Sequence, residues 1–315
     1  MPKPALLQVG PYPEWDQTPL EQAFTVHRYF EAKDKAGFLT TVGPQVRAIA
    51  TKGDLGASSA MIAACPNLEV ICIYGVGYDS VDLAQCRARG IRVTNTPDVL
   101  TDDCADLAVG MLLMQARGMS QAATWVRDGS WQAKGPYPLQ RKVTGLRAGI
   151  LGLGRIGQAV GRRLVGFDMT IAYSARSPKD TPSDWVYVLD PRALAAQSDV
   201  LFVTLAASAS TRHIVGADVI AALGPKGLLI NISRAANIDE EALLTALETG
   251  ALGGAALDVF EGEPALNPRF LALDNVLLQP HHASGTFGTR KVMGKMMRDN
   301  LTAHFAGAPL LSAVI

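Results

Sequence analysis

Residues 148–157 read AGILGLGRIG, and this stretch decides the fold. A short apolar run typical of a buried strand precedes glycines at positions 152, 154 and 157, and a helix-like stretch follows to about Gly166. Glycine permits a tight turn at the first position, close approach of another group at the second, and close packing of helix on strand at the third. A strand, a glycine-rich turn and a helix in this order predict the first unit of a doubly wound parallel sheet.

Strand-like and helix-like segments alternate along the chain from this turn onward. Because parallel strands need a crossover connection, short branched or leucine-rich runs separated by helix-length segments indicate a parallel α/β sheet. The runs that we interpret as strands are 148–153, 169–173, 186–189, 200–205, 227–232, 254–259 and 275–278. They predict a Rossmann-type domain.

The part of the chain before this domain shows the same alternation in a looser form. Its strand candidates are 6–9, 25–29, 48–50, 70–74 and 91–94. We therefore expect a second, smaller α/β domain with a doubly wound, flavodoxin-like parallel sheet.

Helical patterns flank the Rossmann-type domain on both sides. The pattern of residues 102–118 predicts an interdomain helix that ends at a glycine, and a second helical stretch follows up to Gly129. Residues 288–305, after the last predicted strand, have the pattern of a third helix. A chain of 315 residues exceeds the roughly 250–300 residues that one core organises. We expect the last helix to return to the smaller domain, which gives a discontinuous domain of residues 1–99 and 286–315, and a second domain of residues 100–285.

Composition excludes several classes of partner. Lys plus Arg and Asp plus Glu both number 29, so no net positive field favours nucleic acid or an anionic membrane surface. We find no apolar run near 18 residues and no signal-peptide pattern, and we expect a cytoplasmic protein. The 4 cysteines lack CxxC spacing, and we interpret them as small core residues without a metal or disulfide role.

The glycine-rich turn predicts a dinucleotide cofactor. Gly152, Gly154 and Gly157 leave room for a pyrophosphate, and the helix that starts near Arg155 and Ile156 offers backbone N–H groups and partial positive charge to that anion. The alternative is a glycine-rich turn without a ligand.

The segment after the second strand of this domain indicates which dinucleotide is bound. Sites for NAD usually carry Asp or Glu there, about 20 residues after the glycines, whereas this chain has Ser174, Arg176 and Ser177. Hydroxyls and a guanidinium suit a 2′-phosphate, which a carboxylate would repel. The sequence favours NADP(H) and leaves NAD(H) possible, unless Arg176 is an ordinary exposed loop arginine.

Three segments place polar residues directly after predicted strands. They are residues 231–236 (NISRAA), 256–264 (ALDVFEGEP) and 279–286 (QPHHASGT). The carboxyl ends of parallel strands lie at the sheet edge where doubly wound folds bind ligands. Taken singly, Arg234 and Glu263 could form a surface ion pair and His281 could be a loop histidine.

Together with residues 75–79 (GVGYD), 94–102 (TNTPDVLTD) and 152–157, these segments resemble the D-isomer-specific 2-hydroxyacid dehydrogenase family over nearly the whole chain. The stretches YSAR at 173–176 and PHHASGT at 280–286 are most similar to its glyoxylate/hydroxypyruvate reductase and hydroxyphenylpyruvate reductase branch. The resemblance implies a reductase that converts a small 2-keto acid to a D-2-hydroxy acid by hydride transfer from NADPH. The smaller domain would then be the substrate domain, and the larger would bind the dinucleotide.

Such a reduction requires an acid and a cation as well as the hydride. His281 is the candidate proton donor, Glu263 the carboxylate that raises its pKa, and Arg234 the forked cation for the substrate carboxylate and carbonyl oxygens. His282 stands beside His281, and the position in the family motif favours His281.

The resemblance also implies roles for residues that the pattern alone does not single out. Val76 and Gly77 would offer backbone N–H groups to the substrate carboxylate, Asp258 would lie at the nicotinamide carboxamide or behind the site, and Thr101 would lie at the cofactor end of its helix. Trp131 and Tyr137 lie where partner subunits of this family often meet, so we expect a homodimer.

Two other interpretations stay open at this stage. One is an NAD-linked D-lactate, phosphoglycerate or formate dehydrogenase of the same family, and the other is a dinucleotide-sensing binding protein of the corepressor type. The identity of the 2-keto acid and the direction of the reaction in the cell also stay open.

Overall fold

The computed structural model describes residues 2–315 and contains two compact units. The first consists of Met1–Leu100 and Ser284–Ile315, and the second is Thr101–Ala283. The corresponding sequence-based boundaries are 1–99 with 286–315, and 100–285. No helix in residues 2–315 has the length and apolar character needed to cross a membrane.

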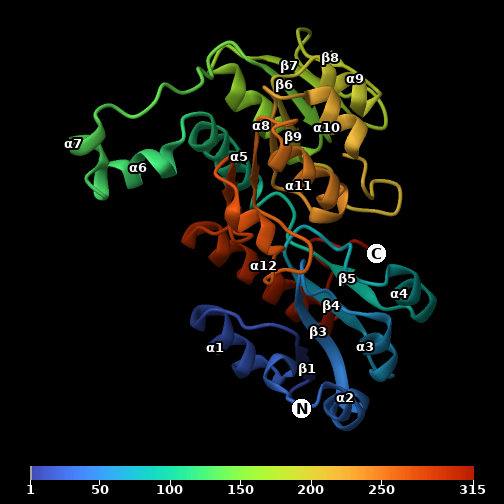
Figure 1. The fold of residues 1–315 in the computed structure, drawn as a ribbon. Helices are drawn as coiled ribbons and strands as arrows, with labels where there is room; N and C mark the ends of the chain where they lie inside the picture. Colours follow the sequence, from blue (N-terminus) through green and yellow to red (C-terminus); the bar gives the residue numbers. More distant parts are fainter. Residues whose placement is uncertain (1) are drawn as a thin grey trace. The chain divides into compact units, whose positions relative to one another are not determined.

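The first unit is built on a parallel sheet of five strands (Figure 1). The strand order is β2-β1-β3-β4-β5, which is the flavodoxin-like order. Its strands are β1 (Ala5–Gln8), β2 (Thr25–Arg28), β3 (Val46–Lys52), β4 (Val70–Tyr74) and β5 (Arg92–Thr94). Its helices are α1 (Glu14–Ala23), α2 (Lys35–Val42), α3 (Ser59–Ala64), α4 (Leu83–Arg89) and α12 (Phe287–Phe305), with short 3-10 turns η1 (Tyr29–Glu31) and η2 (Gly43–Gln45). The predicted smaller α/β sheet is confirmed.

Side-chain caps fix where several of these helices begin. Ser58 accepts a hydrogen bond from the backbone N–H of Met61 at the start of α3, and Asp82 caps α4 in the same way. Such caps satisfy N–H groups that have no partner within the helix. They leave the loops at the carboxyl ends of the strands in defined conformations.

The second unit is a parallel sheet of seven strands in the order β12-β11-β10-β9-β6-β7-β8. Starting from β6, this is the Rossmann order with one further strand. The strands are β6 (Arg147–Leu151), β7 (Thr170–Ser174), β8 (Val186–Tyr187), β9 (Val200–Val203), β10 (Leu228–Asn231), β11 (Gly254–Leu257) and β12 (Val276–Leu278). The helices are α5 (Thr101–Ala116), α6 (Met119–Arg127), α7 (Ser130–Lys134), α8 (Arg155–Val165), α9 (Pro191–Ala196), α10 (Ala217–Leu223) and α11 (Glu240–Thr249), with 3-10 turns η3 (Ala235–Asn237) and η4 (Pro268–Ala272).

Glycine is required by the geometry of the turn between β6 and α8. Gly152 has a φ of +104°, and a Cβ on it would stand 2.5 Å from the backbone nitrogen of Leu205. A Cβ on Gly157 would stand 2.3 Å from the carbonyl oxygen of Gly152. Gly154, by contrast, has no heavy atom within 4 Å of where its Cβ would be. The turn is therefore closed on its sheet side and open at its middle glycine.

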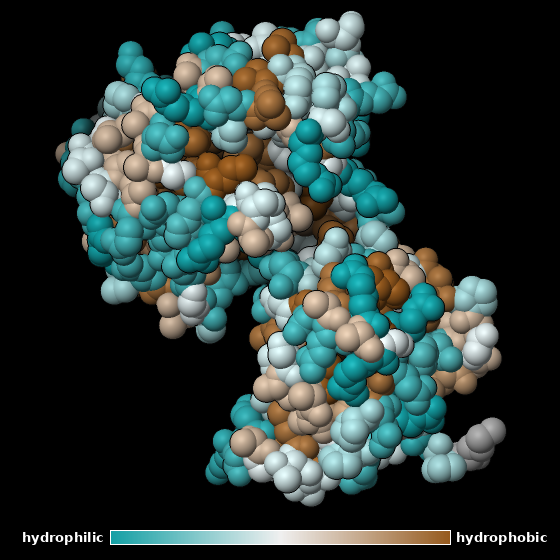
Figure 2. Space-filling view, turned by 90° about the vertical axis from the view of Figure 1, so that its right-hand side faces the viewer, coloured by the Kyte–Doolittle hydropathy of each residue, from teal (hydrophilic) through white to brown (hydrophobic). Residues whose placement is uncertain are grey.

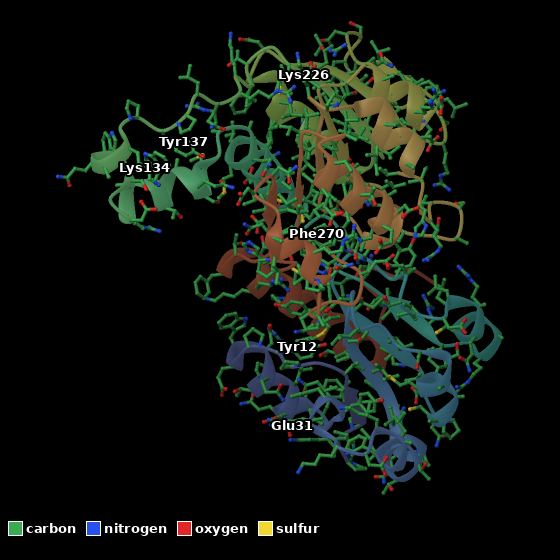
Figure 3. All side chains as sticks on the ribbon, in the orientation of Figure 1. Tyr12, Glu31, Lys134, Tyr137, Lys226 and Phe270 are labelled. Atoms are coloured by element: carbon green, nitrogen blue, oxygen red, sulfur yellow. The ribbon has the colours of Figure 1, made fainter. Side chains whose placement is uncertain are left out.

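Helices α6 and α7 form an arm that stands off the sheet of the second unit, followed by the segment 135–142 (Figures 1 and 3). The Trp125 indole N–H donates to the carbonyl oxygen of Gly135, and the Trp125 and Tyr137 rings meet at 5.8 Å between centroids. The short helix α7 was not foreseen, since only a helical stretch up to Gly129 was expected. Figure 2 shows another face of the molecule, on which hydrophilic residues are interspersed with groups of hydrophobic ones.

Candidate active site

Three adjacent strands of the second unit carry the predicted catalytic residues at their carboxyl ends. Arg234 follows β10, Glu263 follows β11 and His281 follows β12, and these strands are neighbours in the sheet. Their parallel pairing brings the three loops to one sheet edge although they lie far apart in sequence.

His281 and Glu263 form a direct pair. The His281 Nδ1 and Glu263 Oε2 atoms are 2.6 Å apart, and both side chains are about two-thirds to three-quarters buried, with 32% and 26% of their surface exposed. The other carboxylate oxygen, Oε1, accepts a hydrogen bond of 2.7 Å from the backbone N–H of Phe260. One oxygen of the Glu263 carboxylate is thus fixed by a backbone hydrogen bond, and the other is available to the His281 imidazole.

The interaction between His281 and Glu263 shifts the pKa of each residue in the direction that favours its charged form. The hydrogen bond to Glu263 raises the pKa of His281 above its ordinary value of 6.5, although burial and the charge of Arg234 oppose the shift. Burial alone would raise the pKa of Glu263, but the hydrogen bonds from His281 and the Phe260 N–H outweigh burial and lower it below 4.5. Near neutral pH the imidazole therefore keeps its proton more readily than a free histidine.

Arg234 is placed by a local network around Asn231. The Asn231 amide donates to the Arg234 carbonyl oxygen at 3.2 Å, and its Oδ1 accepts from both the N–H and the hydroxyl of Ser233. The Arg234 guanidinium donates to the Ser233 carbonyl oxygen at 2.8 Å. Its charge acts on the pKa values of both His281 and Glu263, so the structure brings all three predicted residues within electrostatic range of one another.

Asp258 holds the backbone directly after His281. This carboxylate is fully buried, and its two oxygens accept hydrogen bonds of 2.9 Å from the N–H groups of His282 and Ala283. Burial raises the pKa of Asp258, while these two donors lower it. His281 itself has a φ of +49°, a left-handed conformation that is uncommon for a residue with a side chain. Asp258 thus stabilises an unusual loop that aims His281 at Glu263.

The side chain of the neighbouring His282 has a different partner. Its Nε2 atom lies 2.8 Å from the side-chain oxygen of Gln279, and the residue is exposed. Of the two adjacent histidines, the structure pairs only His281 with Glu263.

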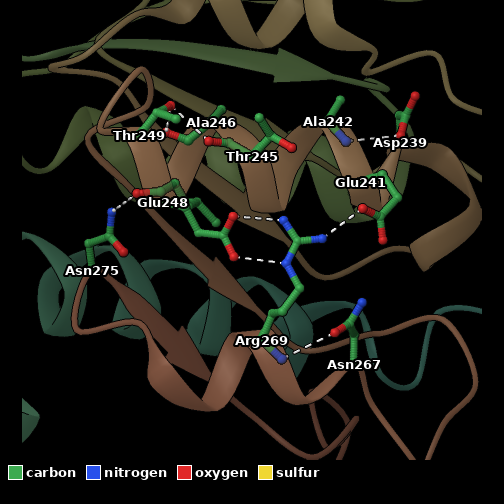
Figure 4. A network of polar contacts seen from close by, with 11 residues as sticks. Asp239, Glu241, Ala242, Thr245, Ala246, Glu248, Thr249, Asn267, Arg269 and Asn275 are labelled. Atoms are coloured by element: carbon green, nitrogen blue, oxygen red, sulfur yellow. Dashed lines mark hydrogen bonds and ion pairs between the residues drawn. The ribbon is translucent and has the colours of Figure 1, made fainter.

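An ion-pair network fixes the far end of the loop that contains Glu263 (Figure 4). Arg269 donates to both carboxylate oxygens of Glu248 at 2.7 and 2.8 Å and to Glu241 at 2.7 Å, all on the same helix, α11. Glu240 of that helix accepts from the backbone N–H of Glu261 at 3.0 Å. Sequence reasoning missed this network, because no local pattern joins Arg269 to carboxylates more than 20 positions away.

The predicted cofactor residues lie around the start of α8 and the end of β7. The amino end of α8, which begins at Arg155 and Ile156, has no side-chain cap, so its backbone N–H groups face the open glycine turn. Arg176 and Ser177 are exposed just beyond β7. Ser174 is buried and its hydroxyl donates to the Leu189 carbonyl oxygen at 3.0 Å, so its proton is already in use.

These residues suit a dinucleotide by their chemistry. Gly154 leaves space for an anion next to the uncapped helix end, and the residues that follow β7 up to Ser177 include no carboxylate. Thr101 is the first residue of α5 in the same unit. Among residues 2–315, no group of three or more His, Cys, Asp or Glu side chains could hold a metal ion.

Val76 and Gly77 lie in the first unit, directly after β4. The Asn95 side-chain amide donates to the Val76 carbonyl oxygen at 2.9 Å, and the Thr96 N–H donates to the Gly75 carbonyl oxygen at 2.9 Å. These bonds fix the conformation of the turn, and the role expected of its N–H groups stays a prediction.

Comparisons with known proteins agree with this description. The family model for the D-isomer specific 2-hydroxyacid dehydrogenase, NAD binding domain, matches residues 109–283. Hydroxyphenylpyruvate reductase of Plectranthus scutellarioides is 44% identical over 310 residues, covering 98% of each chain. The chain is also similar to a solved 2-hydroxyacid dehydrogenase from Ketogulonicigenium vulgare Y25, with 67% identity, a TM-score of 0.92 and coverage of 100% of this chain and 99% of that one. An NADPH-dependent glyoxylate/hydroxypyruvate reductase from Sinorhizobium meliloti, solved with NADP and malonate, is 40% identical with a TM-score of 0.91, covering 99% and 97%.

The His281–Glu263 pair predicts a specific change in histidine titration. In a Glu263→Gln variant the pKa of His281 should fall, because the hydrogen bond and the charge of Glu263 that raise it are lost, while burial and Arg234 still lower it. Imidazole NMR resonances followed against pH measure this, with the His281 signal assigned by its loss in His281→Gln. His27, whose pKa burial lowers, should titrate unchanged in both proteins and serves as an internal control. An unchanged His281 titration in Glu263→Gln would contradict the pairing.

Proposed function

The chain belongs to the D-isomer specific 2-hydroxyacid dehydrogenase family, and we propose that it reduces small 2-keto acids of the glyoxylate or hydroxypyruvate type to D-2-hydroxy acids with NADPH. The observation that carries this proposal is the His281–Glu263 pair beside Arg234 at the carboxyl edge of the sheet that bears the glycine turn. The name of the similar glyoxylate/hydroxypyruvate reductase from Sinorhizobium meliloti supports the same class of substrate.

His281 supplies the proton of the reduction. Its Nδ1–H donates to Glu263, which leaves the Nε2–H as the proton that can move to the carbonyl oxygen of the substrate. After that transfer the neutral ring keeps the same hydrogen bond through Nδ1, so its orientation does not change. Glu263 stabilises the imidazolium before transfer and the correct tautomer afterwards.

The role of Arg234 is to bind the substrate, and it does not transfer a proton. A planar, permanently charged guanidinium can donate to a carboxylate and to the adjacent carbonyl oxygen together, which orients the keto acid and polarises the carbonyl. When bound, NADPH would supply the hydride that the carbonyl carbon accepts. Thr101, Arg155, Ile156 and the glycines of the turn would hold that cofactor.

The cofactor preference rests on the end of β7. Arg176 and Ser177 offer donors to a 2′-phosphate, with no nearby carboxylate in the sequence up to Ser177 to repel it. Ser174 contributes less than the sequence indicated, because its proton is engaged by Leu189. The similar reductase from Sinorhizobium meliloti is NADPH-dependent. We therefore propose NADP(H) as the preferred cofactor, with NAD(H) as a weaker one.

We also propose a homodimer formed through the arm of α6, α7 and the segment 135–142. Met119, Val126 and Trp131 are at least half exposed and Leu139 is fully exposed. A groove of about 430 Å³ lined by Met119, Tyr137 and Leu139 among others runs along the same arm. Clustered exposed apolar side chains are typical of protein interfaces.

The cysteines suit a reducing compartment, and we propose that the protein is cytoplasmic. Cys65, Cys72, Cys86 and Cys104 are buried and form no disulfide. Burial raises the pKa of Cys65 to about 11 and that of Cys72 to about 12, so these thiols stay protonated and unreactive. Free thiols without disulfides are the usual state in the cytoplasm.

The proposed activity and cofactor predict the following kinetics. The purified protein should oxidise NADPH on addition of glyoxylate or hydroxypyruvate, with a lower KM for NADPH than for NADH. Arg176→Ala should raise the KM for NADPH by about tenfold, since one charge-assisted hydrogen bond is lost, while the KM for NADH changes by less than about twofold. Absorbance at the reduced-nicotinamide band measures both. No turnover with any 2-keto acid would refute the function, and a clear NADH preference would refute only the cofactor assignment.

The dimer predicts a solution mass of twice 33.4 kDa. Light scattering after size exclusion measures it directly. Leu139→Asp should shift the mass to that of the monomer, because it places a charge in the apolar contact. Leu271→Asp is the matched control, since Leu271 is an exposed leucine of the same unit outside the arm, 69% exposed. A monomeric wild-type protein, or a dimer that both variants leave intact, would count against this interface.

A further inference from the structure

Two loops meet at the carboxyl edge of the sheet in the first unit. Lys52, the last residue of β3, is the direct strand partner of Tyr74, the last residue of β4. The backbone nitrogen of Gly53 lies 3.4 Å from the point that a Cβ on Gly75 would occupy. Lys52 therefore stands next to the turn whose Val76 and Gly77 N–H groups are expected to bind substrate.

A second cation approaches the same place from α12. The Arg290 guanidinium lies over the Tyr74 ring at 5.7 Å from its centroid, and the Tyr74 hydroxyl donates to the Arg290 carbonyl oxygen at 2.6 Å. Tyr12 packs on Tyr74 at 5.4 Å between ring centroids and donates to the Thr51 carbonyl oxygen at 3.0 Å. These contacts hold the two tyrosines in place beside Arg290 and the end of β3.

The two cations have no ion-pair partner among residues 2–315. Neither Lys52 nor Arg290 takes part in an ion pair, although both side chains are partly buried. Burial lowers the pKa of Lys52, Asp54 opposes the shift, and the charge of Arg290 lowers it further, so the two like charges repel each other. Asp54 is exposed. Partly buried, mutually repelling cations are costly unless an anion binds between them.

We propose that Lys52 and Arg290 form a subsite for a second carboxylate on the substrate, so that 2-keto diacids are reduced more efficiently than monoacids of equal length. The proposal rests on the function proposed above, and it names the class of substrate that the site prefers. Val76 and Gly77 would take the carboxylate next to the keto group, and the cations would take the one at the other end.

Two four-carbon substrates test the subsite. Oxaloacetate and 2-ketobutyrate differ in that a carboxylate replaces the terminal methyl group. The wild-type kcat/KM should be higher for oxaloacetate, and Lys52→Gln should lower the ratio of the two values by at least about tenfold through loss of one charge contact. Lys52→Arg keeps the charge and should keep the ratio. Lys33→Gln, an exposed lysine of the same unit, is the matched control and should change nothing.

A binding experiment can test the subsite independently of the proposed activity. Calorimetric titration with malonate and propionate, a matched dicarboxylate and monocarboxylate, needs no turnover. Lys52→Gln should weaken malonate binding by at least about tenfold and propionate binding by less than about twofold. If malonate and propionate binding weaken equally, Lys52 binds the carboxylate that the two ligands share. If neither affinity changes, Lys52 binds no part of the substrate. Both results overturn the subsite, whereas absence of NADPH oxidation with every keto acid overturns the activity.

Discussion

The hydrogen bond of 2.6 Å between His281 Nδ1 and Glu263 Oε2 is the interaction on which the proposed chemistry of this protein depends. It exists because β11 and β12 are parallel neighbours, so the loops after them leave the sheet at the same edge. The rest of the local structure serves to keep it in place. Asp258 fixes the chain after His281, the Phe260 N–H fixes one oxygen of Glu263, and the Arg269 network fixes the loop beyond it.

The same bond couples stability to pH. The pKa of His281 is raised, so the stability it contributes is fully present below pH 6.5 and is lost as the pH rises through the shifted value. The pKa of Glu263 is lowered, so its contribution is present above pH 4.5 and is lost as the pH falls through the shifted value. The ion pair is therefore strongest in the window between these limits. Proton donation by His281 weakens above the upper limit, so the rate of keto acid reduction should fall as the pH rises through it.

Much of this arrangement could be predicted from the sequence, because it depends on patterns that are local. Apolar runs revealed every strand of both sheets. The strand predicted for 200–205 is shorter than expected and ends at Val203, and the Thr204 hydroxyl donates a hydrogen bond to the Gly152 carbonyl oxygen. The glycine turn and the order of polar residues after the strands located the loops that hold Arg234, Glu263 and His281. Contacts between distant segments could not be predicted, such as the bond from Ser174 to Leu189 and the pairing of Arg269 with α11. The electrostatic influence of Arg290 on Lys52 could not be predicted for the same reason, since 238 positions separate the two residues.

The most direct test of the central claim compares the two adjacent histidines. His281→Gln should lower kcat for keto acid reduction by about 10²- to 10⁴-fold, the usual contribution of a general acid, while the Kd for NADPH measured by fluorescence stays unchanged. His282→Gln should keep nearly full turnover, because that ring bonds to Gln279 and lies away from Glu263. Loss of turnover in His282→Gln with a fully active His281→Gln would contradict the account.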